Sequence, residues 1–125
     1  MTLVSIVQMN SQDDIEANFK VIESLIIQAK SDDASLIVFP ENFVCFAAGK
    51  QRETAERFEA FEQRLQQLAH THQIWIVAGT LPCPYRPDGT IVPDGRVRTT
   101  SLCISPERTA ARYDKIHLFD VQVGD

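Results

Sequence analysis

The chain has 125 residues, 44% of them hydrophobic and 23% charged, which suits one modest soluble domain with a core but not two domains. Its net charge of −5 is spread without a Lys/Arg run, which argues against nucleic-acid binding. No stretch approaches the length of a membrane span, and the N-terminus lacks the basic start of a signal peptide. The cytoplasm is therefore the expected location.

The first third of the chain predicts a strand followed by an amphipathic helix. Leu3 to Met9 is mostly apolar and uncharged, as in a strand buried on both faces. Ser11 is placed to cap the helix, with Asp14 as its partner in a capping box. The helix should end near Lys30. Its apolar stripe consists of Ile15, Phe19, Ile22, Leu25, Ile26 and Ala29.

A second strand and helix lead into a third strand. Leu36 to Phe39 predicts a short strand that Pro40 closes, because proline has no N–H for the ladder. A helix is expected roughly from Thr54, with a third buried strand from Ile74 to Ala78. The stripe of this helix is Phe58, Phe61, Leu65, Leu68 and His72. The β-α-β-α-β alternation predicts an α/β fold of parallel strands with right-handed crossovers.

The remaining chain predicts a loop and a β-hairpin. Residues 80–95 are rich in proline and glycine and are predicted to be loop. Val97 to Ser105 and Thr109 to Asp114 predict two strands around the turn at residues 106–108. From Ile116 onward we expect loop.

Two charged residues stand where predicted strands run out into loops. Glu41 follows the second strand, and Lys115 follows the second strand of the hairpin. Either residue alone would be an ordinary surface charge. However, ligands of open parallel sheets bind outside the carboxyl ends of the strands, so we expect the two side chains to approach one another there, close enough for one small substrate group to touch both. A carboxylate and an ammonium group at such ends are suited to proton transfer and to stabilising an oxyanion.

The segments around these residues, LIVFPENF at 36–43 and RYDKIHLFD at 112–120, resemble the segments that carry the catalytic glutamate and lysine of the nitrilase superfamily, the carbon–nitrogen hydrolases. The resemblance implies that Glu41 and Lys115 are catalytic and that a nucleophilic cysteine lies beyond this chain. It also implies the N-terminal half of an α-β-β-α sandwich. Residues 1–125 would then be the N-terminal portion of a single hydrolase domain, incomplete at the C-terminus.

The PENF and KIHLFDV forms look closest to the amidase branch that includes omega-amidase and deaminated glutathione amidase. This implies a small amide with a carboxylate end as substrate, no cofactor, and a homo-oligomer at full length. The isolated chain should be inactive, because it lacks the nucleophile. It should also associate or fold incompletely, because half a sandwich leaves one sheet face and a strand edge uncovered.

The three cysteines are expected to be reduced and non-catalytic. Cys45, Cys83 and Cys103 share no short metal-binding spacing, and their odd number does not suit a disulfide framework. In the family the nucleophile follows the lysine, and no cysteine follows Lys115 here. Cys103 lies in an apolar run and is expected to be a small buried residue.

Three further residues lie in the segment around Lys115 or in the hairpin strand. His117 is a candidate general base because histidine generally titrates near neutral pH, but its equivalent in the family accompanies the lysine without being catalytic, so we interpret it as structural. Asp120 could orient neighbouring loop groups, which the sequence does not decide. Thr99 stands where many relatives carry an asparagine, a departure that leaves the triad positions unchanged.

Two other functions remain open. A nucleotide-binding α/β module fits the β-α-β start, but the first strand leads into Met9 to Gln12, where no glycine supplies a phosphate-binding turn. The chain could also be a non-catalytic remnant or an interaction subunit of the same fold. Assay of amide hydrolysis separates this last hypothesis from an enzyme.

Overall fold

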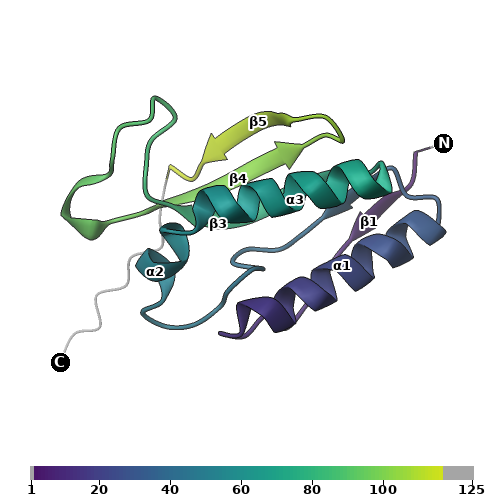
Figure 1. Ribbon diagram of the computed structural model, residues 1–125, viewed down its shortest axis with the longest axis horizontal. Helices are drawn as coiled ribbons and strands as arrows, with labels where there is room; N and C mark the ends of the chain where they lie inside the picture. Colours follow the sequence, from purple (N-terminus) through teal and green to yellow (C-terminus); the bar gives the residue numbers. More distant parts are fainter. Residues whose placement is uncertain (1, 117–125) are drawn as a thin grey trace.

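The strands form one mixed sheet with the order β1-β2-β3-β4-β5. The computed structural model describes residues 2–116. Its elements are β1 (Val4–Ile6), α1 (Ile15–Ser31), β2 (Leu36–Val38), α2 (Gln51–Ala55), α3 (Phe58–His72), β3 (Trp75–Cys83), a 3₁₀ turn (Pro93–Gly95), β4 (Arg98–Ile104) and β5 (Thr109–Asp114). The first three strands are parallel, and the β3–β4 and β4–β5 pairs are antiparallel. The predicted α/β order with a terminal hairpin is confirmed (Figure 1).

Helix α1 has a different cap from the one predicted. Asp14 is the N-cap, and its side chain accepts a hydrogen bond from the Ala17 N–H at 3.0 Å. The expectation that Ser11 caps the helix was wrong, because its hydroxyl is buried and donates instead to the Phe43 carbonyl at 2.7 Å. The apolar stripe is confirmed by the helix's buried side chains, which include Phe19, Ile22, Ile26 and Ala29.

The single helix predicted from about Thr54 is two helices. The short helix α2 ends at Ala55, and α3 begins at Phe58. Helix α3 ends at His72, and its C-cap residue Gln73 has a φ of 50°, in the left-handed region. Its buried residues are Phe58, Phe61, Leu65 and Ala69. None of the helices in the described part of the chain is long and apolar enough to cross a membrane.

Strand β3 extends further than its sequence suggested. It continues past Gly79 to Cys83, so the prediction that residues 80–83 are loop was wrong. Leu81 and Cys83 are fully buried, and this burial favours continued pairing with β4 despite Pro82. A register shift between Ala78 and Leu81 accommodates the irregularity.

The core lies between the sheet and the layer formed by α1 and α3, which run side by side across one sheet face (Figure 1). The two helices meet through the Phe19 and Phe61 rings, whose centroids are 5.8 Å apart. On the surface above, Arg64 donates two hydrogen bonds of 2.9 Å to the carboxylate of Glu16. Each helix therefore covers part of the sheet and buries its stripe against its neighbour.

The opposite face of the sheet is uncovered within residues 2–116. Ile6 is 82% exposed, and Val4, Trp75 and Tyr113 are also exposed on this face. The expectation that the first strand is buried on both faces was therefore wrong for this part of the chain. The predicted open sheet face is present, and the association expected from it stays a prediction.

A buried asparagine joins the two loops at the carboxyl ends of β1 and β2. The Asn18 amide nitrogen donates to the Val44 carbonyl at 2.8 Å and to the Gln12 carbonyl at 2.9 Å, and its oxygen accepts from the Gln12 N–H at 3.1 Å. Asn18 is only 4% exposed. It therefore satisfies loop groups that water cannot reach.

We predict that Asn18→Ala lowers the free energy of unfolding by about 1–3 kcal/mol, because it leaves buried carbonyl groups without a donor. Urea denaturation monitored by circular dichroism measures the change. Ser24→Ala, at an exposed position of the same helix, is the matched control. An equal effect of the two substitutions would show that Asn18 does not stabilise the loops.

Candidate active site

Glu41 projects from a turn that neighbouring strands hold on both sides. The Phe39 N–H donates to the Val77 carbonyl at 2.9 Å, which extends the pairing with β3 just beyond β2. Thr80 of β3 makes hydrogen bonds to the residues on both sides of Glu41. Its N–H donates to the Pro40 carbonyl at 3.2 Å, and its hydroxyl accepts from the Asn42 N–H at 3.3 Å. Glu41 thus lies on the loop side of the strand end, as predicted.

Buried aromatic rings anchor the same turn. Phe39 and Phe43, on either side of Glu41, are 1% and 0% exposed, and their rings stack with centroids 4.9 Å apart. Asn42 between them has a φ of 53°, the left-handed region that asparagine adopts more readily than most residues. Burial of the two rings leaves the intervening Glu41 side chain to point outward, where it is 55% exposed.

Lys115 follows the last residue of β5 directly. Its N–H donates to the Thr99 carbonyl at 2.8 Å, which continues the β4–β5 pairing to the lysine itself. The structure thus gives Thr99, the departure noted in the sequence, a backbone role at the site. The Lys115 side chain is 40% exposed.

Glu41 and Lys115 come together although 74 residues separate them. The Lys115 Nζ atom lies 3.4 Å from Glu41 Oε1. The predicted proximity of the two side chains at one edge of the sheet is therefore confirmed. An exposed pair of this kind contributes only about 0–1 kcal/mol to stability, so it leaves both groups available to a ligand.

A buried carboxylate lies next to this pair in sequence. Asp114 accepts hydrogen bonds from Thr100 Oγ1 at 2.9 Å, Arg98 Nε at 3.0 Å, and Arg112 Nε and Nη2 at 2.9 and 3.1 Å. Burial acts to raise the pKa of Asp114, but the bonds from Arg112, Thr100 and Arg98 outweigh it and hold the pKa below its ordinary value. The carboxylate is therefore charged at neutral pH.

The cysteines do not assemble with the pair in the described part of the chain. Cys83 is fully buried, and burial raises the pKa of its thiol, which opposes formation of a thiolate. Cys45 is 9% exposed. Cys103 pairs with Val77 and Ala111 in the middle of the sheet but is only half-buried, so the expectation that it is a buried residue was wrong. Within residues 2–116, no three His, Cys, Asp or Glu side chains gather to hold a metal ion.

The predictions for His117 and Asp120 lie outside the described residues. Sequence reasoning missed Asn18, Thr80 and the Asp114 cluster. Asn18 could have been found from the sequence. It is a polar residue four positions before Ile22, so it lies on the core-facing side of the helix. Thr80 could not be found once its segment was interpreted as loop.

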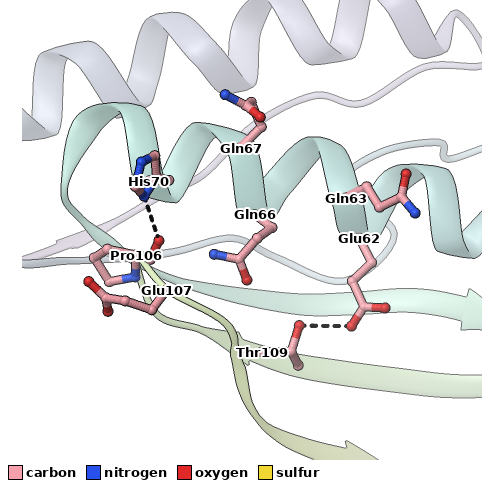
Figure 2. Close-up of a pocket in the computed structure, with 8 residues that line it drawn as sticks. All are labelled: Glu62, Gln63, Gln66, Gln67, His70, Pro106, Glu107 and Thr109. Atoms are coloured by element: carbon pink, nitrogen blue, oxygen red, sulfur yellow. Dashed lines mark hydrogen bonds between the residues drawn. The ribbon is translucent and has the colours of Figure 1, made fainter.

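A sizeable hollow lies away from this site. It has a volume of about 550 Å³ and lies between α3 and the turn from β4 to β5 (Figure 2). Some of its polar side chains are paired: Thr109 donates to Glu62 at 2.8 Å, Gln66 donates to the Ser105 carbonyl at 2.8 Å, and the His70 ring lies 3.1 Å from the Pro106 carbonyl. These bonds attach the turn of the β4–β5 hairpin to α3. The turn is at the end of the hairpin opposite to Lys115.

Comparison with known proteins agrees with the geometry. The family described as carbon–nitrogen hydrolase matches residues 3–125. The chain belongs to the carbon–nitrogen hydrolases. It is 34% identical over 128 residues to a deaminated glutathione amidase of Synechocystis sp. and 33% identical over 125 residues to one of Yersinia enterocolitica. These matches cover 98% of this chain but only 44% and 42% of the relatives, so the chain spans less than half their length.

Solved structures show the same fold. The Caenorhabditis elegans NitFhit protein matches with a TM-score of 0.81 at 28% identity, over 96% of this chain and 29% of that one. The NitN amidase from Nesterenkonia sp. AN1 matches with a TM-score of 0.80 at 21% identity, over 97% of this chain and 46% of that one. The fold is the nitrilase-type α/β arrangement, and residues 2–116 form one helix-covered sheet of it.

We predict that the stabilising effect of Asp114 is lost in acid. Its pKa is lowered on folding, so its contribution is complete above the unfolded pKa of about 3.9 and disappears as pH falls through the folded value. Asp114→Asn should therefore lower the free energy of unfolding by about 1.5–3 kcal/mol at pH 7, and by less as pH falls below about 4. Urea titrations of wild type and Asp114→Asn at pH 7 and at pH 3 measure the change in the free energy of unfolding.

The comparison variant is Asp88→Asn. Hydrogen bonds from Thr90 also lower the pKa of Asp88, but this carboxylate is fully exposed, so its loss should change stability less. If the difference between wild type and Asp114→Asn is the same at pH 7 and pH 3, the charge of Asp114 is not the source of stability.

Proposed function

We propose that Glu41 and Lys115 are the general base and the cationic stabiliser of an amidase that hydrolyses small amides bearing a carboxylate. The observation that carries this proposal is the 3.4 Å approach of their side chains at the edge where β2 and β5 end. Membership of the carbon–nitrogen hydrolases supports the reaction class. The two deaminated glutathione amidases at 33–34% identity support the substrate class.

The proposed reaction requires a thiol nucleophile, for which a cysteine beyond Asp125 is expected from the resemblance. A free thiol has a pKa of about 8.5, so at neutral pH it needs a base to ionise. Glu41 takes the thiol proton while sulfur attacks the amide carbon, and the carbonyl oxygen becomes an oxyanion. The Lys115 ammonium group stabilises that negative charge.

The second half of the reaction returns the enzyme to its starting state. The tetrahedral intermediate collapses, the C–N bond breaks, and Glu41 gives its proton to the leaving amine, which leaves a thioester. Glu41 then takes a proton from water as the water oxygen attacks the thioester. The C–S bond breaks, the carboxylic acid leaves, and the proton returns to the thiolate. A mutant of a Nesterenkonia amidase with the same fold shows covalent addition of the acetamide moiety of fluoroacetamide at its active site cysteine.

We predict that Glu41→Gln and Lys115→Ala each lower kcat for a small carboxylate-bearing amide at least about 100-fold in the complete gene product, because each removes proton transfer or oxyanion stabilisation. Steady-state kinetics measure this, and circular dichroism confirms folding. The exposed substitutions Glu107→Gln and Lys20→Ala are matched controls. Near-normal turnover in either site variant would refute that residue's role.

The same assay separates the enzyme from the alternative, a non-catalytic chain of this fold. The proposal expects hydrolysis by the complete gene product and none by residues 1–125 alone. A complete protein that contains the thiol yet releases no amine from any small amide would support the alternative. Comparing each amide with its counterpart that lacks the carboxylate tests the substrate class.

A further inference from the structure

The pair of Lys115 and Glu41 does not fix its own geometry. Both side chains are substantially exposed, at 40% and 55%, and their 3.4 Å contact is long for a charged hydrogen bond. Lysine also has a flexible stem and gains little from an exposed ion pair. The place of the ammonium group must therefore be set by the backbone from which the lysine emerges.

That backbone is held at one point by a side-chain cluster. Asp114 pairs with Thr100 across the β4–β5 ladder, and it is the last residue of β5. Its carboxylate accepts from Thr100 and Arg98 of β4 and from Arg112 of β5. Four donor contacts of 2.9–3.1 Å thus converge on a side chain that is only 4% exposed. This ties the end of β5 to the start of β4 immediately before Lys115.

The cluster is itself attached to the core. Arg112 Nη2 donates to the Tyr85 carbonyl at 2.7 Å, and its guanidinium group lies 5.4 Å from the centre of the Tyr85 ring. The Tyr85 ring in turn meets Phe58 of α3 edge-on at 5.6 Å. Burial raises the pKa of Tyr85 to about 12, as expected of a ring in this packed position. Movement of Asp114 would therefore disturb several packed groups.

The Asp114 side chain lies on the helix-covered face of the sheet, whereas Lys115 points away from that face. Arg112, two residues before Asp114 in the strand, pairs with Leu102, whose side chain is buried in the core beneath the helices. Successive residues of a strand point to opposite faces, so Asp114 faces the helix layer and the next residue points away from it. Asp114 is thus placed to orient Lys115 without touching a substrate.

We infer that Asp114 is the positioning residue for Lys115: its hydrogen bonds to Arg98, Thr100 and Arg112 lock the end of β5 so that the lysine ammonium group faces Glu41. This inference deepens the proposed function and rests on it for the catalytic consequence. Exchange of carboxylate for amide keeps the shape of the side chain but removes the negative charge that holds two guanidinium groups.

The kinetic test uses Asp114→Asn in the complete gene product. A displacement of about 1 Å can cost roughly 100-fold in rate, so kcat should fall about 10- to 100-fold while KM stays within about twofold. Glu107→Gln, an exposed carboxylate in the β4–β5 turn, is the control and should leave both constants unchanged. Wild-type kcat in Asp114→Asn, or a rise in KM with kcat unchanged, overturns the inference.

A second variant keeps the inference testable if Asp114→Asn does not fold. Arg98→Met removes one donor from Asp114 but keeps the pairing between Arg112 and Asp114, and Arg98 is itself partly exposed. It should show the same kind of change, a lower kcat at constant KM, to a smaller extent. An Arg98→Met variant with wild-type kcat overturns the inference even if Asp114→Asn cannot be obtained folded.

A labelling experiment tests the positioning without turnover. The acetylation rate of Lys115, followed by mass spectrometry and scaled to Lys20 in the same sample, reports how well Lys115 is held. Glu41→Gln removes its partner and should raise the rate about two- to fivefold, as for loss of an exposed ion pair. Asp114→Asn should produce a similar rise.

The two experiments separate failure of this inference from failure of the proposed function. If the complete protein hydrolyses no amide but Asp114→Asn still raises Lys115 labelling, the positioning stands and the amidase proposal falls. If Lys115→Ala abolishes turnover while Asp114→Asn changes neither kcat nor labelling, the amidase proposal stands and the inference falls.

Discussion

The site depends on one constraint, which is the direction of the strands. Because β1, β2 and β3 are parallel, their carboxyl ends open at one edge of the sheet. Two successive antiparallel pairings then reverse the chain twice, so β5 runs in the same direction as β2 and ends at that edge. A Glu and a Lys that are 74 residues apart meet there although β2 and β5 are not neighbours in the sheet. The hairpin is therefore part of the site and not an appendage of the sheet.

Each charged residue is positioned by neighbouring groups other than its ion-pair partner. For Glu41 these are the stacked Phe39 and Phe43 rings and the two hydrogen bonds of Thr80. For Lys115 the corresponding group is the Asp114 carboxylate. Buried anchors of this kind allow the reactive side chains to remain exposed to a ligand while their backbones stay fixed. This arrangement explains why a weak ion pair can define a site.

The sequence predicted the strands and helices wherever apolar periodicity dominated. The runs at 36–39 and 109–114 and the stripe from Phe19 to Ala29 needed only local patterning. Glu41 and Lys115 could be named because each follows such a run and lies in a segment that resembles the family. Their expected meeting followed from strand ends alone, although β5 reaches the edge through antiparallel pairs and not through a parallel crossover.

Other features depend on tertiary partners that a local pattern does not contain. Pro82 indicated loop, yet burial of Leu81 and Cys83 extends β3 through it. Ser11 fitted a cap, but its hydroxyl found a buried carbonyl 32 residues away. The four bonds of Asp114 come from two strands and could not be inferred before their register was known.

The most direct test of the central claim is a crystal structure of the complete gene product with a bound small amide that bears a carboxylate. The account predicts the amide carbonyl oxygen at about 2.7–3.1 Å from Lys115 Nζ, with a Glu41 oxygen within hydrogen-bonding reach of the amide nitrogen or the attacking group. An amide bound elsewhere, for example in the hollow between α3 and the β4–β5 turn, with neither Glu41 nor Lys115 in contact, would contradict it.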